Sequence, residues 1–105
     1  MSSKAYWIGS INVTDMEKYK PYVAMVTAIL AKYRGRFLVR GGNCDMVEGK
    51  IGPRVIVIEF RDYATAHECY FSSEYAAAKA VRLTASQGDV VIVEGYDGPQ
   101  PAVAS

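Results

Sequence analysis

The chain has 105 residues, of which 50% are hydrophobic, a length and composition typical of a single domain with its own core. Its 12 basic and 11 acidic side chains give a formal net charge of +1, and no basic cluster is interleaved with aromatic residues, so we expect no nucleic-acid partner. No apolar run reaches the roughly 18 residues that span a bilayer and no signal sequence is evident, so we expect a cytoplasmic protein without a membrane partner.

The first predicted strand, Ala5–Val13, is rich in aromatic and β-branched residues. After it, Thr14 and Asp15 supply N-cap chemistry for a helix. Because Pro21 has no N–H group, we expect a single turn over Asp15–Tyr19 and then a main helix with Pro21 in its first turn.

This first helical region has one apolar stripe at offsets of three and four residues, which indicates a helix with one buried face. The stripe consists of Tyr19, Tyr22, Val23, Val26, Ile29, Leu30 and Tyr33. Gly35 follows the stripe and is predicted to end the helix as a residue in the left-handed conformation.

A second strand is predicted to begin with Arg36–Arg40, to be interrupted by Gly41 and Gly42, and to continue over Asn43–Glu48. Paired glycines inside a strand indicate a β-bulge, or a place where another backbone or a ligand comes close. A turn then leads into the third predicted strand, Arg54–Phe60.

Asp62 is predicted to cap a second helical region, Tyr63–Tyr70, which is broken near Ser72. Ser73 is predicted to cap its continuation, Glu74–Ala85, where many alanines allow the helix to lie close to a sheet.

The last predicted strand is Asp89–Glu94, after Gln87 and Gly88 end the helix. Residues 96–105 contain two prolines and are predicted to form a tail, so the domain is expected to occupy residues 1–95.

The order of these elements, β-α-β-β-α-β, predicts an α+β, ferredoxin-like domain with one four-stranded antiparallel sheet and both helical regions on one face. Val55–Ile58 and Val90–Val93 are each four consecutive β-branched apolar residues, a pattern typical of strands buried on both faces. Because the helices cover only one face, we expect a second copy to cover the other, in a homodimer paired sheet to sheet.

The cysteines and the histidine argue against metal and redox sites. Cys44 and Cys69 form no CxxC pair, which favours two buried, reduced thiols over a disulfide. His67 is the only histidine, so a zinc site has too few ligands, and we expect neither a metal nor a cofactor.

Several segments resemble the domain of unknown function 1330 (DUF1330) family, in the same order and spacing from about Ala5 to Gly95. The most specific run is GRFLVRGG, within Lys32–Gly42, and the other segments are Tyr6–Ile8, Val57–Phe60, Tyr70–Tyr75 and Gly88–Gly95. The resemblance implies the dimeric α/β-barrel superfamily, whose ferredoxin-like subunits pair by their sheets. It implies no activity, because the family has no established one.

Subunits of this superfamily often hold ligands between the helices and the sheet, so the resemblance implies a small-molecule pocket there. The candidate residues for such a pocket are Tyr6, Tyr19, Tyr22, Arg40, Glu59, His67, Tyr70 and Tyr75. The tyrosines either place hydroxyl groups in an apolar pocket or pack as amphipathic residues at the edge of the core.

Each of the candidates Arg40, Glu59 and His67 has a functional and a structural interpretation. Arg40 either binds a carboxylate of the ligand or forms a structural ion pair with Glu59, which would be costly to bury alone. His67 is the default general acid or base because imidazole titrates near neutral pH, and Glu59 is the second catalytic candidate. The alternative for His67 is a surface position, and Cys69 is better explained by packing than by nucleophilic attack.

Three functional hypotheses follow. The first is a small bacterial homodimer with no established activity and a small-molecule pocket in each subunit. The second is a cofactor-independent enzyme, similar to a monooxygenase or isomerase, that acts on a small carbonyl or aromatic compound with Arg40 as the anion anchor. The third is a non-catalytic ligand-binding or stress-related module. A haem protein is disfavoured because His67 would have to be the axial ligand.

Overall fold

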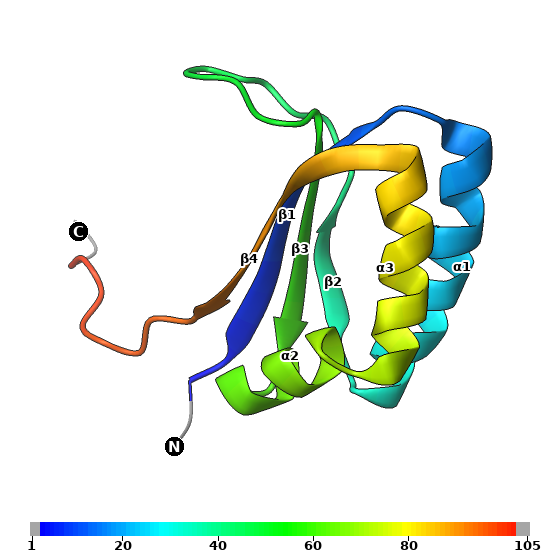
Figure 1. Ribbon diagram of the computed structural model, residues 1–105. Helices are drawn as coiled ribbons and strands as arrows, with labels where there is room; N and C mark the ends of the chain where they lie inside the picture. Colours follow the sequence, from blue (N-terminus) through cyan, green and yellow to red (C-terminus); the bar gives the residue numbers. More distant parts are fainter. Residues whose placement is uncertain (1–2, 103–105) are drawn as a thin grey trace.

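The computed structural model describes residues 3–102 and has one four-stranded antiparallel sheet of strand order β2-β3-β1-β4 (Figure 1). The strands are β1 (Ala5–Val13), β2 (Arg36–Arg40), β3 (Arg54–Phe60) and β4 (Ser86–Glu94), and the helices are α1 (Met16–Lys32), α2 (Tyr63–Tyr70) and α3 (Ser73–Ala85). This is the predicted ferredoxin-like arrangement, so the fold class is confirmed. Residues 1–2 of the predicted domain and 103–105 of the predicted tail lie outside the described residues.

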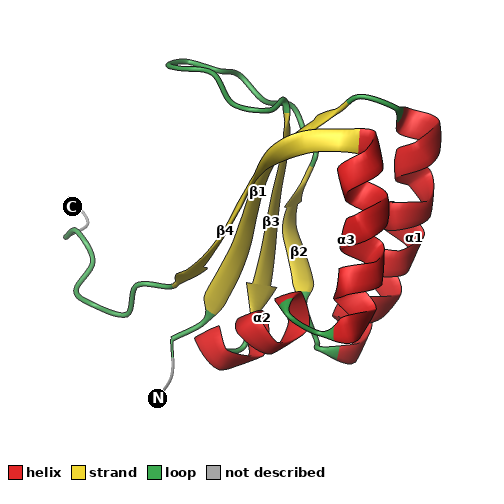
Figure 2. Ribbon diagram, viewed as in Figure 1, coloured by secondary structure: helices red, strands yellow, loops and turns green. Residues whose placement is uncertain are grey.

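The helices lie on one face of the sheet only. Figure 2 shows α1 and α3 side by side on that face, with α2 at the end of the sheet where β3 finishes. Successive side chains of β1 alternate between the two faces: Trp7 and Ile11 are buried beneath the helices, whereas Ile8 on the other face is 37% exposed. The predicted apolar stripe of α1 forms much of the buried layer, through Tyr19, Tyr22, Val26, Ile29 and Leu30.

The sheet face away from the helices, the open face, is apolar and uncovered in the single chain. The strand register places Ile8 beside both Val57 and Val91, and Val93 beside Tyr6. Val91 is 53% exposed and Val93 is 42% exposed. The expectation that the helices leave one sheet face bare is therefore confirmed.

Helix α1 is continuous, so the predicted break before Pro21 is wrong. Asp15 caps the helix by accepting a hydrogen bond from the Lys18 N–H at 3.2 Å. Pro21 deprives only the Glu17 carbonyl of its helical donor, and both residues are exposed, so the lost hydrogen bond falls on the solvent side of the helix. Among residues 3–102, neither this helix nor another combines the length and the apolar character that a bilayer crossing requires.

The left-handed residue at the end of α1 is Arg34, with φ 59°, and not Gly35 as predicted. The Gly35 N–H donates to the Leu30 carbonyl at 2.8 Å and the Arg34 N–H donates to the Ala31 carbonyl at 3.2 Å, which is a Schellman motif. Close packing explains the glycine at position 35, because a Cβ atom there would lie 3.0 Å from Leu30 Cδ2 and 3.2 Å from Phe60 Cε1.

Residues 41–53, the arm, project beyond the sheet instead of continuing β2 (Figure 1). The predicted strand over Asn43–Glu48 is therefore wrong. Gly41, at φ +67°, turns the backbone away from the ladder just after its N–H bonds to the Val55 carbonyl at 2.9 Å. The irregularity in the pairing lies earlier, between Phe37 and Val39.

The junction between α3 and β4 also differs from the prediction. Ser72, not Ser73, is the N-cap of α3, and its Oγ accepts from the Tyr75 N–H at 3.1 Å. Strand β4 begins directly at Ser86, so Gly88 is paired within the sheet and does not end the helix. A Cβ atom on Gly88 would collide with the Ser10 carbonyl oxygen and lie 2.9 Å from the Ile11 Cα.

We therefore predict that Gly88→Ala lowers the free energy of unfolding by about 1–3 kcal/mol, because the added methyl group displaces backbone of β1. Urea unfolding followed by circular dichroism measures this change. Gly42→Ala is the control, since nothing lies within 4 Å of a Cβ atom there, and it should change stability by less than about 0.5 kcal/mol. Equal stability of the two variants would contradict the close approach of β4 to β1.

Candidate functional site

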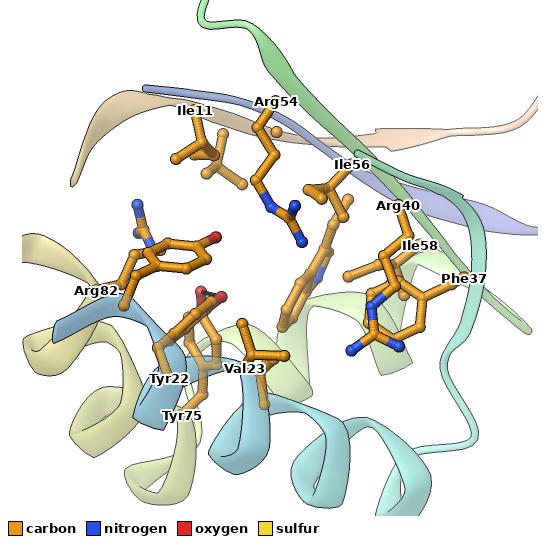
Figure 3. Close-up of a pocket in the computed structure, with 15 residues that line it drawn as sticks. Ile11, Tyr22, Val23, Phe37, Arg40, Arg54, Ile56, Ile58, Tyr75 and Arg82 are labelled. Atoms are coloured by element: carbon orange, nitrogen blue, oxygen red, sulfur yellow. Dashed lines mark hydrogen bonds between the residues drawn. The ribbon is translucent and has the colours of Figure 1, made fainter. Parts of the chain in front are cut away.

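A cavity of about 50 Å³ lies between the helix-covered face of the sheet and helices α1 and α3. Its walls are mainly apolar, with Ile56 and Ile58 from β3 opposite Val23 from α1 (Figure 3), and Val26 of α1 also lines it. The polar groups in the wall are three tyrosines and three arginines, Tyr19, Tyr22, Tyr75, Arg40, Arg54 and Arg82. An apolar chamber with a few polar groups is the usual form of a small-molecule site.

Gly9 leaves part of this space empty at the centre of β1. A Cβ atom on Gly9 would meet nothing closer than the Ile11 side chain at 3.8 Å, so no clash requires glycine here. Glycine inside a strand costs roughly 0.5–1 kcal/mol relative to alanine. The packing gains nothing from this cost, which indicates that the open space itself is useful.

Tyr22 and Tyr75 join their hydroxyl groups at 2.9 Å at the wall formed by α1 and α3. Burial raises the pKa of the Tyr22 phenol, and the neighbouring Tyr75 adds to this effect. Burial likewise raises the pKa of Tyr75, although the Arg82 guanidinium partly opposes it. Both phenols therefore stay protonated at neutral pH and act as neutral hydrogen-bonding groups, not as bases.

Arg82 is the most buried charged side chain of the site. It belongs to the buried side of α3 and is only 5% exposed. Burial disfavours its charged form, but the adjacent Tyr75 and Tyr22 hydroxyls outweigh this and hold the pKa of Arg82 above its ordinary value. The guanidinium is therefore a permanent positive charge in the wall of the cavity.

No acidic side chain lines the cavity to neutralise this charge. Arg82 lies 6.0 Å from the Tyr22 ring centroid and Arg54 lies 5.7 Å from that of Tyr19, near the outer limit of cation–π contact. Such contacts contribute about 0.5–2 kcal/mol. The Coulomb attraction that raises the pKa of Arg82 requires ionised Tyr75 and Tyr22. Because both phenols are protonated at neutral pH, the ring contacts offset only part of the several kcal/mol that an unpaired buried charge costs.

Three of the predicted ligand-binding residues, Arg40, Tyr19 and Tyr22, line the cavity, together with Tyr75. Arg40 lies at the end of β2, where its guanidinium stacks 4.1 Å from the Phe37 ring centroid and donates to Thr27 Oγ1 at 3.2 Å. These placements bring the residues to one cavity, and their role in binding stays a prediction.

Glu59 lies on the open face, so the predicted ion pair with Arg40 is wrong. The register places Glu59 opposite Arg36 and Tyr6, whereas Arg40 is opposite Ile56 on the helix-covered face. Glu59 instead lies 3.7 Å from the Lys4 ammonium and accepts from the Tyr6 hydroxyl at 3.3 Å. Partial burial, together with this carboxylate, raises the pKa of Tyr6.

Neither His67 nor Tyr70 lines the cavity. The His67 ring lies on α2 between Tyr63 and Phe71, with centroids 4.5 and 5.7 Å away, and its Nε2 is buried without a hydrogen-bond partner. Tyr70 packs edge-on against Trp7 at 5.4 Å, and its ring centroid lies 5.0 Å from that of Tyr75. The two predicted catalytic residues, His67 and Glu59, are thus not brought together with each other or with the cavity.

Arg54 and Arg82 were not among the predicted site residues. Arg82 lies on the buried face of α3, seven residues after Tyr75, four after Ala78 and three before Ala85. This spacing puts a charged residue within an apolar helical stripe, a signal from which Arg82 could have been predicted as a site residue. Arg54 is the first residue of β3, and no comparable pattern marks it.

The described residues hold no obvious metal site. Within residues 3–102, His, Cys, Asp and Glu side chains do not gather in groups of three that could hold a metal ion.

The two cysteines differ in exposure and are both free. Cys69 is fully buried, as predicted, and burial raises the pKa of its thiol to about 12. Cys44 lies in the arm and is exposed, so the expectation of two buried thiols is wrong for this residue. A buried thiol that stays protonated is not a nucleophile, which supports a packing role for Cys69.

A family model described as a domain of unknown function (DUF1330) matches residues 4–96. No curated protein matches the chain in sequence. A solved protein of unknown function from Rhodopseudomonas palustris is 13% identical and matches with a TM-score of 0.73, over 93% of this chain and 86% of its own.

Two further solved structures share the fold. A dimeric ferredoxin-like protein of unknown function from Jannaschia sp. CCS1 is 14% identical, with a TM-score of 0.67 over 88% of this chain and 99% of its own. SnoaB, a cofactor-independent oxygenase from Streptomyces nogalater, is 9% identical, with a TM-score of 0.65 over 92% of this chain and 97% of its own. At these identities the comparisons show a common fold and do not transfer an activity.

We predict that an aromatic disulfide reagent at pH 8 labels one thiol rapidly in the folded protein and the second only after denaturation. Cys44 is exposed and reacts, whereas Cys69 is buried and stays protonated at this pH. Absorbance of the released thiolate measures both phases. Cys44→Ser should abolish the rapid phase alone, and rapid labelling of that variant would contradict the burial of Cys69.

Proposed function

The chain belongs to the DUF1330 family of unknown function, and we propose that it is a homodimer that holds a small organic molecule between the helices and the sheet of each subunit. The observation that carries this proposal is the cavity beside Gly9, a space that packing does not require and that the central strand keeps open at a cost in stability.

The open face supports the homodimer. Ile8, Val91 and Val93 form an apolar surface that a second sheet can cover at the usual separation of about 10 Å. Burying roughly 400 Å² of such surface contributes about 10 kcal/mol before the costs of association. A two-fold axis lets the same face serve both subunits, and the dimeric relative with this fold is consistent with such pairing.

Binding without chemistry fits the cavity better than acid–base catalysis. Catalysis of proton transfer needs a group that titrates near neutral pH within reach of the ligand. No histidine or carboxylate is among the cavity-lining residues, because His67 lies on α2 and Glu59 lies on the open face.

A cofactor-independent enzyme acting on a small carbonyl or aromatic compound is the second candidate. Two observations favour it: the paired Tyr22 and Tyr75 hydroxyls in the cavity wall, and a fold similar to that of an oxygenase that needs no cofactor. In this version the phenols donate hydrogen bonds to the substrate, and the arginines stabilise developing negative charge.

We predict that Val91→Lys converts the dimer into monomers, because it places a charge within the apolar open face, on the edge strand β4. Sedimentation velocity at micromolar concentration measures the mass of the particle. Leu83→Lys is the matched control: Leu83 on α3 is 59% exposed and lies outside the sheet, so this variant should keep the mass of the wild-type protein. A wild-type protein that sediments as a monomer would refute the homodimer.

We also predict that Gly9→Val raises the free energy of unfolding by about 1 kcal/mol and removes any retained small molecule, because the side chain fills the cavity. Native mass spectrometry of freshly purified protein reports the ligand and the subunit number, and urea unfolding reports the stability. Gly42→Val makes the same change in open space and should leave the stability and the retained ligand unaltered. Retention of the same ligand by Gly9→Val would place its site elsewhere.

A further inference from the structure

The cavity has a fixed positive character that the rest of the chain does not neutralise. Arg54 reaches into it from β3, and Arg82 lines it from α3 (Figure 3). Among the described residues, every ion pair of arginine uses Arg36 or Arg61 and none uses Arg40, Arg54 or Arg82. No carboxylate of residues 3–102 therefore pairs with the charge of Arg40, Arg54 or Arg82, and of these three only Arg82 is buried from solvent.

One N–H donor in each of the Arg54 and Arg82 guanidinium groups also lacks a hydrogen-bond acceptor. The Nε atoms of Arg54 and Arg82 are both buried and have no hydrogen-bond partner. The Arg82 side chain is 5% exposed, so bulk water does not replace the missing acceptor. Buried donors normally have a partner, which is a protein group, an ordered water molecule or a bound ligand, so these two N–H groups are available to an acceptor in the cavity.

The nearby tyrosines do not supply the missing charge. Tyr22 and Tyr75 donate to or accept from one another and remain protonated, because burial raises the pKa of each phenol. The wall therefore combines neutral hydroxyl groups with positive guanidinium groups and contains no negative group.

We propose that this cavity binds a small organic anion, a short-chain carboxylate, whose carboxylate group accepts hydrogen bonds from Arg54 and Arg82. Guanidinium forks match the two oxygens of a carboxylate, and Trp7, Val26 and Ile56 provide apolar contacts for a short hydrocarbon body. This inference rests on the proposed ligand-binding function and specifies the chemical class of the ligand.

The size of the cavity sets the size of the ligand. A volume of about 50 Å³ corresponds to roughly three to five positions of a water molecule, which fits an acid of about three carbon atoms. The apolar walls favour such an acid over inorganic phosphate, whose oxygens would face Ile56 and Val26 without partners.

The experiment compares propionate with propionamide, which has the same shape but no charge, and with inorganic phosphate. Trp7 is the only tryptophan of the chain and lines the cavity, so its fluorescence reports ligand entry in the full-length dimer. We expect propionate to bind at least tenfold more tightly than propionamide or phosphate. Equal binding of propionate and propionamide would overturn the anion inference and leave the small-molecule pocket intact, whereas phosphate binding as tight as propionate binding would overturn the carboxylate class.

Arg82→Met tests whether the arginine serves the ligand or the fold. We expect this variant to bind propionate at least tenfold more weakly and, without ligand, to unfold at a higher urea concentration than the wild type, because it removes an unpaired buried charge. Arg61→Met is the control, since Arg61 is 71% exposed and lies outside the cavity, and it should bind propionate normally.

The outcomes separate this inference from the proposed function. Arg82→Met that is less stable than the wild type without ligand would identify Arg82 as a structural residue and overturn the inference. If none of the three probes changes Trp7 fluorescence, the inference fails, and the ligand retention of Gly9→Val then decides whether the pocket itself survives.

Discussion

The packing of the helices against Trp7 determines the shape of the candidate site. The Trp7 ring lies 5.1 Å from Phe60 and 4.9 Å from Tyr75, and its indole N–H donates to the Ala66 carbonyl at 2.9 Å. One side chain of the central strand thus joins the sheet to both α2 and α3. The cavity borders the same ring, so the contacts that hold the helices on the sheet also fix the walls of the space beside them.

Because side chains alternate along each strand, one face of the sheet borders the cavity and the other is the apolar open face. Residues of even and odd number along β1 point to opposite sides, so Ile8 belongs to the open face and Gly9 to the cavity. The same rule separates Glu59 from Arg40, which the sequence alone suggested as partners. A dimer formed by the open face would leave the cavities on the outer, helical side of each sheet, where a ligand can still enter.

Electrostatics distinguish the cavity from the surface of the protein. On the surface, several lysines and arginines have carboxylate neighbours, as Lys32 has Glu74 at 2.7 Å, and such pairs are individually weak. In the cavity, Arg82 has no ion-pair partner among residues 3–102, and it cannot lose its proton to relieve the cost of burial. A cavity wall with positive guanidinium groups and no negative group is a simple physical basis for selecting an anion.

The sequence by itself determined the fold, because the signals for helices, strands, caps and turns are local. Strands β1 and β3 and helix α2 begin and end at the predicted residues. The apolar runs in the strands also indicated that the helices leave one face of the sheet bare. The sequence also identified Tyr19, Tyr22 and Tyr75 as candidate residues for a pocket between the helices and the sheet. Only the tertiary structure decided which polar residues share a cavity, since that depends on strand register and helix rotation. The strand register places Glu59 on the open face, away from the cavity, and the orientation of α3 places Arg82 in the cavity wall.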